Sequence, residues 1–284
     1  MDKRILIGRM KRSYFFRIGV VGIIFIFIAC YIGPLFIEWD PIKTSIDGRF
    51  LPPEGFARGF KGHILGTDQL GRDVLIRLLI GGQYSFRLAF FVVFFQTCIG
   101  TFMGILSGYV GGWIDIVIMR ACDMLMSIPG LIMSIAVIAI LGQSTINLII
   151  VMTISSWVQL CKVTRNNVRV VKQMEFVSAS KVLGAGLGRI MFKQILPNCT
   201  TNIIILSSQR IGHTIIMEAS LSYLNLGIKP PAPSWGNMIS QGRTFLTTQP
   251  WLILVPGFTL MLAVLSFNFL GDGIRDILDT KRKI

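Results

Sequence analysis

Long uncharged stretches alternate with short polar or basic segments along this chain. A helix that spans a membrane needs about 20 predominantly apolar residues, and five stretches are long and apolar enough to supply such helices. One of them is long enough for two spans, because residues 142–145 form a polar break near its middle. The five stretches are residues 18–37, 88–114, 124–161, 199–217 and 244–271. The pattern therefore predicts an all-α, polytopic membrane protein with six transmembrane helices.

The overall composition agrees with a membrane protein. Of the 284 residues, 52% are hydrophobic and 15% are charged, whereas a soluble domain usually carries about 25% charged residues. The formal net charge of +14 is compatible with nucleic-acid binding. However, no basic stretch is interleaved with aromatic residues that could stack on bases, so we expect no nucleic-acid partner.

The basic residues cluster in segments that the six-helix arrangement places on one side of the membrane. They lie in the first 17 residues, in residues 162–193 and after residue 274, while the segment 38–87 balances seven basic against six acidic residues. Loops rich in Lys and Arg stay in the cytoplasm, so we predict that both termini are cytoplasmic and that the first of them contacts anionic membrane lipid. The expected organisation is a tail, a first transmembrane helix, an extracytoplasmic segment, a core of five transmembrane helices with a cytoplasmic loop at 162–197, and a second tail: 1–17, 18–37, 38–84, 85–271 and 272–284.

The cysteines and methionines do not point to a metal site. None of the five cysteines forms a C-x-x-C pair, and all lie within or beside predicted spans, which argues against a disulfide framework and a zinc site. Several methionines between residues 119 and 133 could bind a soft metal, but methionine in such apolar helices is usually a packing residue. We expect no catalytic residue, metal or cofactor on this chain.

Four glycines recur at every fourth position in the second predicted helix. A stripe of this kind clears one helix face, so that another helix backbone can approach closely. The alternative is that the glycines are ordinary components of a membrane helix. We favour a helix-packing role for the four residues, which are Gly100, Gly104, Gly108 and Gly112.

The segment between the fourth and fifth predicted spans is too polar to cross a membrane. Residues 175–183 contain few helix breakers and place Phe176, Ala179, Val182 and Leu183 on one helical face. Three glycines at 184, 186 and 188 then interrupt the helix, and residues 189–195 can resume it. The result is a short amphipathic helix between two bends. It could transmit force from a soluble partner, or it could lie on lipid headgroups.

This segment resembles the EAA loop of ABC importer permeases, in which a short helix docks on a cytosolic ATPase. The loop's pattern is E-A-A, three residues, Gly, nine residues, then I-x-L-P, and Ala179, Gly184, Leu196 and Pro197 match it. Ser178 stands at the glutamate position, Ser180 replaces the second alanine and Gln194 replaces the isoleucine. Glu175 supplies a nearby acidic group out of register. The resemblance makes this segment the ATPase-coupling loop.

Two further segments resemble permeases for dipeptides, oligopeptides and nickel. One is Leu65-Gly66-Thr67-Asp68-Gln69-Leu70-Gly71-Arg72-Asp73-Val74-Leu75-Ile76-Arg77, before the second span. The other lies after the fifth span and comprises residues 218–227 and 230–239. The family resemblance implies a type I importer fold in a bacterial inner membrane, a second and different permease subunit, two ATPase subunits and an extracytoplasmic solute-binding protein.

The resemblance also assigns ATP to the partner subunits. No G-x-x-x-x-G-K-[ST] motif occurs in the chain, so we expect it to bind no ATP and to act as a transport subunit, not an enzyme. It would form half of a translocation pathway for a peptide, a nickel complex or a metallophore. A secondary transporter or channel would share the spans, but it needs no EAA-like loop.

Polar residues within the fifth predicted span are candidates for the translocation pathway. Charged residues inside a membrane are costly and often functional. Arg210 and His213 lie one turn apart, and Glu218 follows near the outer end. Arg210 could contact a carboxylate or carbonyl group of the solute, or it could pair with an acid such as Asp123. We favour the pathway for Arg210 and a structural role for His213.

Overall fold

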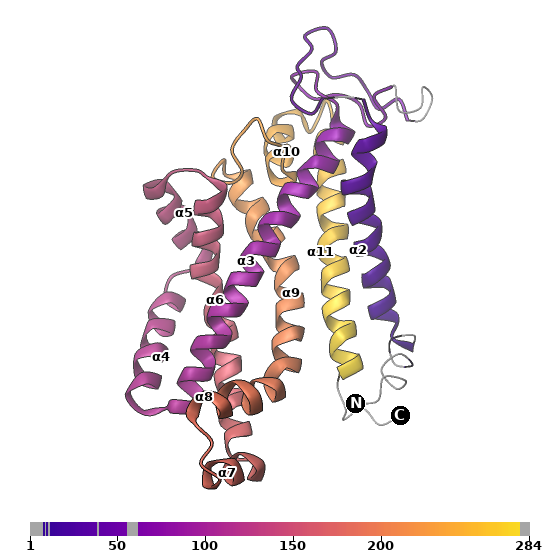
Figure 1. Ribbon diagram of the computed structural model, residues 1–284. Helices are drawn as coiled ribbons and strands as arrows, with labels where there is room; N and C mark the ends of the chain where they lie inside the picture. Colours follow the sequence, from indigo (N-terminus) through magenta and orange to yellow (C-terminus); the bar gives the residue numbers. More distant parts are fainter. Residues whose placement is uncertain (1–7, 9, 11, 39, 56–61, 279–284) are drawn as a thin grey trace.

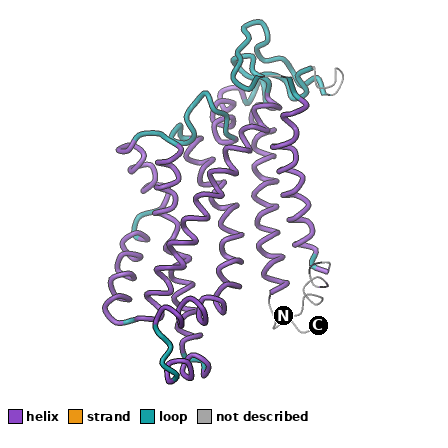
Figure 2. Tube along the Cα trace, in the orientation of Figure 1, coloured by secondary structure: helices purple, strands orange, loops and turns teal. Residues whose placement is uncertain are grey.

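Helices joined by loops make up the described part of the protein, which is residues 8, 10, 12–38, 40–55 and 62–278 of the computed structural model (Figures 1 and 2). Within these ranges there is no strand, only one isolated bridge between Thr67 and Asp73. The all-α prediction is confirmed. Parts of both predicted tails, namely residues 1–7, 9, 11 and 279–284, lie outside the described residues.

Four long helices have the length and apolar character to cross a membrane. They are α2 (Tyr14–Ile32) with the short 3-10 turn η1 (Gly33–Phe36), α3 (Val74–Val110), α6 (Thr145–Lys172) and α11 (Trp251–Leu278). Helix α9 (Leu196–Tyr223) has 28 residues, and at 1.5 Å per residue it is about 42 Å long. It is therefore long enough to cross a membrane, although its polar residues make it less apolar than the other four.

The third predicted span, which ends at the polar break of residues 142–145, is not one straight helix. It consists of α4 (Gly112–Met126) and α5 (Gly130–Leu141), which meet at an angle of 86°. Pro129 precedes α5; proline has no backbone N–H, and it disfavours a helical conformation in the residue before it. The bent pair counts as one candidate span, which brings the apolar spans to five among the described residues.

Helix α3 begins earlier than the sequence pattern predicts. The side chain of Asp73 caps its first turn by accepting a hydrogen bond from the N–H of Ile76 at 2.9 Å. The helix has 37 residues and is about 55 Å long, whereas the hydrocarbon core of a bilayer is about 30 Å thick. A helix of this length therefore extends beyond the hydrocarbon core, and the domain boundary predicted at residue 85 falls inside it.

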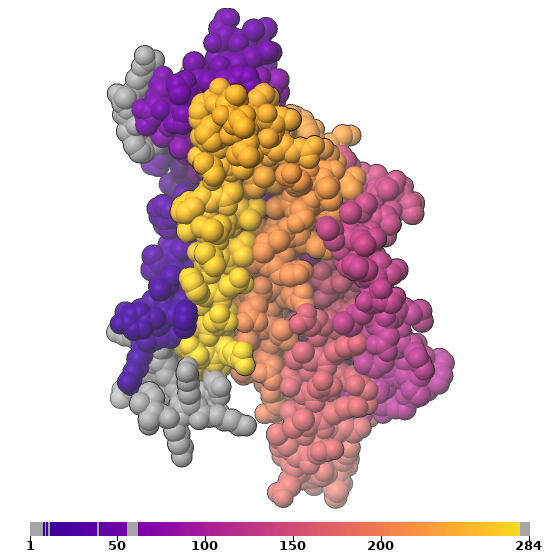
Figure 3. All heavy atoms as spheres, turned by 180° about the vertical axis from the view of Figure 1, so that it is seen from behind, coloured from indigo at the N-terminus to yellow at the C-terminus, as the bar shows by residue number. Residues whose placement is uncertain are grey.

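The bundle is organised around three helix contacts. Helix α3 packs along α6, and α11 packs against both α2 and α9. The view from behind places α2 and α11 side by side at the surface, with α9 next to α11 (Figure 3). At the outer end, α10 (Trp235–Gly242) buries Trp235 completely among residues of α2, α3 and α11.

Three of the four candidate packing glycines lie where α3 approaches α6. A Cβ atom at Gly100, Gly104 or Gly108 would lie 2.7–2.8 Å from a backbone carbonyl oxygen of α6. Those oxygens belong to Trp157, Cys161 and Arg165, which are also four residues apart. Any side chain larger than hydrogen would force the two helices apart. Gly112 differs: it begins α4 with φ +57° and faces open space, so it takes no part in this contact.

We expect Gly104→Ala to destabilise the protein by about 1–3 kcal/mol, because the added methyl group overpacks the contact between α3 and α6. A lower midpoint in a thermal unfolding assay of the purified protein would show this. Gly257→Ala is the matched control, since no described atom beyond its own helix lies within 4 Å of a Cβ at that helical position. Equal midpoints for the two variants would contradict the close-packing account.

Candidate functional site

The segment after α6 forms a projection at one end of the bundle. It contains α7 (Glu175–Val182), the short α8 (Leu187–Arg189) and a π-helical turn at Ile190–Ile195 that leads into α9. Gly184 ends α7 with φ +77°, a conformation that favours glycine. Figure 1 shows α7 at the lower extreme of the molecule, beyond the ends of α3 and α6. The helix, the break and the resumed helix predicted from the sequence are all present.

One buried face fixes α7 to the bundle. Val177 is fully buried in a cluster that includes Tyr109 of α3 and Ile190 and Ile195 of the π-helical turn. A side-chain bond adds to this contact, because Gln194 Nε2 donates to Ser180 Oγ at 2.7 Å. Phe176 and Val182, which the sequence pattern predicts on one helical face with Ala179 and Leu183, are exposed, and Val177 provides the buried contact. One buried side chain and one polar pair therefore both hold α7 to the bundle.

The far end of the projection exposes large apolar side chains. Val182, Leu183 and Leu187 are 88%, 86% and 66% exposed. Most of the predicted coupling residues are also exposed, while Ser180 and Leu196 are half-buried. The exposed ones are Glu175, Ser178, Ala179, Gly184 and Pro197. An apolar tip on a polar loop is typical of a surface that another protein covers.

A charged cluster sits at the base of the projection. Asp115, in the first turn of α4, accepts hydrogen bonds from Arg165 Nε at 2.5 Å and Arg169 NH2 at 2.7 Å, and also from the hydroxyl of Ser107. These contacts join α3, α4 and α6. The ammonium group of Lys172 donates to the carbonyl oxygen of Tyr109 at 2.6 Å. The base of the projection is therefore a point at which three helices are tied together.

Tyr109 links this cluster to α7. Its ring is 5.4 Å from Lys172 Nζ and 5.5 Å from Lys181 Nζ, and its side chain is 4% exposed. Cation–π contacts of this kind stabilise by about 0.5–2 kcal/mol. Tyr109 and Asp115 were not among the residues predicted from the sequence. The available signals were the four-residue spacing of Arg165 and Arg169 and the isolated acid at Asp115.

The three pathway candidates of α9 lie in different surroundings. Glu218 is fully buried, and the hydroxyl groups of Ser85 and Ser222 donate to its carboxylate at 3.0 and 2.6 Å. It thus fastens α9 to α3 and does not face a pathway, contrary to the expectation. Arg210 is half-buried and His213 is exposed. Among the described residues Arg210 has no acidic partner; Asp123, proposed as its partner, pairs with Lys162 at 2.9 Å.

The motif before α3 folds into a buried polar network at the other end of the bundle. Asp68 accepts from the backbone N–H groups of Leu70 and Arg72 at 2.9 and 3.0 Å and pairs with Arg72 Nε at 2.7 Å. Arg77 Nε lies 3.5 Å from the same carboxylate, and its NH1 donates to the carbonyl oxygen of Pro41. The three charged residues are at most 6% exposed. The network folds the outer segment back on the start of α3.

The second outer motif completes this end of the bundle. The indole N–H of Trp235 donates to the carbonyl oxygen of Leu78 in α3 at 2.9 Å, and Asn237 Nδ2 donates to the carbonyl oxygen of Ile228 at 2.5 Å. Arg72 NH2 reaches Gln241 Oε1 at 3.1 Å. The two motifs, which are far apart in sequence, therefore form one polar layer that joins α3 and α10.

Comparison with known proteins identifies the family. Residues 100–284 match the family described as binding-protein-dependent transport system inner membrane component. The chain is 37% identical to the dipeptide transport system permease protein DppC of Haemophilus influenzae, over 93% of this chain and 91% of that protein. It is 43% identical to the glutathione transport system permease protein GsiD of Escherichia coli, over 78% of this chain and 73% of that protein.

Solved structures agree in fold. An inward-facing structure of the MetNI methionine ABC transporter superposes with a TM-score of 0.59 at 17% identity, covering 72% of this chain and 97% of that chain. A crystal structure of an amino acid ABC transporter gives a TM-score of 0.53 at 14% identity, covering 69% and 91%. The fold is that of a type I ABC importer permease.

The chain belongs to the family of binding-protein-dependent inner membrane components. It is a multi-pass permease subunit of an ATP-driven ABC importer of the peptide transport type. In this class ATP is hydrolysed on separate subunits, so the chain is a transport subunit and not an enzyme. This membership confirms the family inferred from the EAA-like loop and excludes the secondary transporter considered as the alternative.

We expect Asp68→Asn to destabilise the outer end by about 3–5 kcal/mol, because it leaves two buried arginines without their carboxylate. Limited proteolysis of the segment 40–73 and the thermal unfolding midpoint measure the effect. Asp47→Asn is the control, since Asp47 is exposed. Unchanged proteolysis in the Asp68 variant would show that the buried pair does not hold this segment.

Proposed function

We propose that this permease, paired with a second and different permease subunit, imports peptides when ATP closes two ATPases against its α7 projection. An extracytoplasmic binding protein would deliver the solute to the opposite, motif-rich end. Both termini would then be cytoplasmic. The observation that carries the proposal is the exposed apolar tip of α7, seated on a base that joins three helices.

The geometry of the projection suits force transmission. Val182, Leu183 and Leu187 form the surface that the ATPase would cover, and burying one such side chain contributes about 1.5–3 kcal/mol. Behind this surface, Val177 and the Gln194–Ser180 bond hold α7 to the chain entering α9. A push on the tip would therefore tilt α9 relative to α3 and α6, which opens or closes a pathway on the α9 surface.

A peptide is the solute class that the relatives favour. The two relatives described above are named for a dipeptide and for glutathione, which is a small peptide. Small peptides carry a free carboxylate, and a basic side chain on the pathway would complement it. The nickel complex and metallophore considered from sequence have no comparable support from these two relatives.

Arg210 is the residue proposed to meet the solute. It is half-buried on α9, and none of the described acids pairs with it. A guanidinium group can bind a carboxylate through two parallel hydrogen bonds. His213, one turn further on, is exposed and would line the same surface. Glu218 belongs to the buried contact with Ser85 and Ser222 and has no part in the pathway.

We expect Leu183→Asp to weaken ATPase binding at least tenfold, because a carboxylate replaces an apolar side chain that the proposed interface buries. Co-purification of the ATPase subunits from detergent-solubilised membranes measures the effect. Leu246→Asp makes the same substitution at a half-exposed leucine at the opposite end of the bundle and should retain the ATPases. Retention of the ATPases by the Leu183 variant would refute the coupling role of α7.

We expect Arg210→Gln to reduce uptake of a radiolabelled dipeptide at least tenfold at normal membrane abundance, because the charged partner of the solute carboxylate is lost. Arg243→Gln, at a basic residue of the outer loop that contacts the Tyr223 ring, controls for loss of one positive charge. Normal uptake by the Arg210 variant would remove this residue from the pathway. It would leave the ATPase-coupling proposal unaffected, since the co-purification assay tests that separately.

A further inference from the structure

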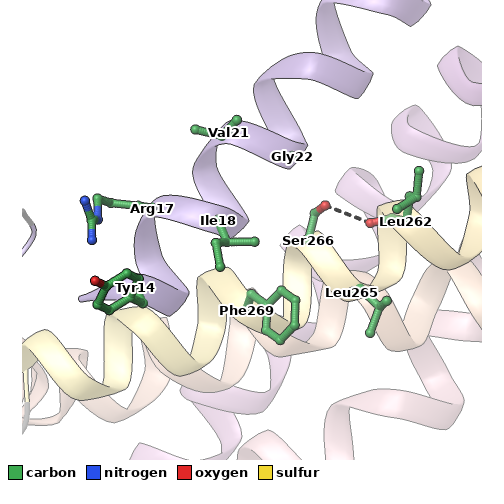
Figure 4. A pocket seen from close by; sticks show the side chains of 9 residues that line it. All are labelled: Tyr14, Arg17, Ile18, Val21, Gly22, Leu262, Leu265, Ser266 and Phe269. Carbon is green, nitrogen blue, oxygen red and sulfur yellow. Dashed lines mark hydrogen bonds between the residues drawn. The ribbon is translucent and has the colours of Figure 1, made fainter. Parts of the chain in front are cut away.

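An apolar groove of about 650 Å³ runs between α2 and α11, near the end of the bundle that carries α7 (Figure 4). The two helices meet at small residues: a Cβ atom at Gly19 would lie 2.4 Å from the backbone nitrogen of Leu270. Such close contact leaves a hollow beside the seam, which larger side chains border. Ile18, Val21, Leu262, Leu265 and Phe269 supply most of its walls.

The floor of the groove offers no free polar group. The hydroxyl of Ser266 donates to the carbonyl oxygen of Leu262 in its own helix at 2.7 Å (Figure 4). The sides are open to the surroundings, since Val21 is 66% exposed and Leu265 is 40% exposed. Within a bilayer, water does not fill an apolar hollow of this kind. Lipid tails are as apolar as leucine, so a lipid chain and an apolar helix fit this hollow about equally well. The charge at the mouth of the groove distinguishes the two occupants.

The mouth of the groove is basic. Arg17 is exposed, its guanidinium carbon lies 4.7 Å above the ring of Tyr14, and both residues line the groove (Figure 4). No described acidic residue pairs with Arg17, and the lining contains no acid. Tyrosine is enriched at the membrane–water interface, and arginine binds phosphate through paired hydrogen bonds. The mouth thus has the chemistry of a phosphate site at headgroup depth.

We propose that this groove binds one anionic glycerophospholipid. Its phosphate would bind Arg17 beside Tyr14, and one acyl chain would lie along the seam past Ile18 and Leu265 towards Val21 and Leu262. A lipid held there would fill the gap between α2 and α11 and so stabilise the attachment of the most peripheral helix. The proposal does not depend on the solute or on the role of α7.

Binding is tested on the complete transporter purified in a mild detergent and stripped of lipid. Phosphatidylglycerol and phosphatidylcholine are titrated in, and the bound molecules are counted by native mass spectrometry. We expect a preference for phosphatidylglycerol that Arg17→Gln reduces about fivefold, the effect of one basic side chain at an anionic surface. Arg12→Gln removes the same charge from an exposed residue outside the groove and should change it little.

The position of the lipid is tested with phosphatidylglycerol that carries a photoreactive diazirine in its acyl chain. We expect adducts on peptides containing Val21 and Leu265. Val21→Trp, which fills the groove, should abolish them, while Phe25→Trp, at an exposed residue of the same helix outside the groove, should not. Equal effects of the two arginine variants would overturn the proposal. So would adducts unaffected by Val21→Trp, or cross-links showing that another protein subunit covers the groove.

Discussion

The close contact between α3 and α6 is the constraint on which the rest of this permease depends. Three glycines of α3 meet three carbonyl oxygens of α6 at the same four-residue spacing, so the two backbones run together over several turns. Within a bilayer, apolar burial does not drive helices together, and close packing must supply the attraction instead. Because α3 begins in the outer polar network and α6 ends at α7, this contact connects the two ends of the molecule.

The paired charges follow the same division. Asp68 with its two arginines lies at the outer end of α3, and Asp115 with its two arginines lies at the other end. Each cluster pairs one carboxylate with two guanidinium groups, so each retains net positive charge where water or headgroups are near. The cost of burying a charge is lower there than at the bilayer centre. Each polar cluster thus fixes one end of the pair formed by α3 and α6. Between the two clusters, apolar contacts hold the pair together.

The sequence was most informative where a feature depends on local spacing. The glycine stripe at 100–108, the break at Gly184 and the apolar character of four spans all follow from residue type at fixed intervals. The sequence was less informative where the burial or role of a residue depends on a partner that is distant in the sequence. The burial of Val177, the role of Glu218 and the surroundings of Arg210 depend on which helices lie opposite. The bend at Pro129 is an intermediate case. The proline is visible in the sequence, but the angle of 86° between α4 and α5 depends on how α5 packs.

Two of the departures of this chain from the EAA pattern lie in contact with each other. Ser180 replaces an alanine and Gln194 replaces an isoleucine, and these two polar side chains form a hydrogen bond of 2.7 Å between α7 and the π-helical turn. This directional hydrogen bond helps to hold α7. The Ser180 hydroxyl in turn donates to the carbonyl oxygen of Phe176 within α7 at 2.9 Å. Such a bond depends on geometry more steeply than apolar contact does, so it restricts the angle between α7 and the chain that enters α9. In the coupling role proposed for α7, transmission of tilt would require a defined angle, and the Ser180–Gln194 pair would supply it.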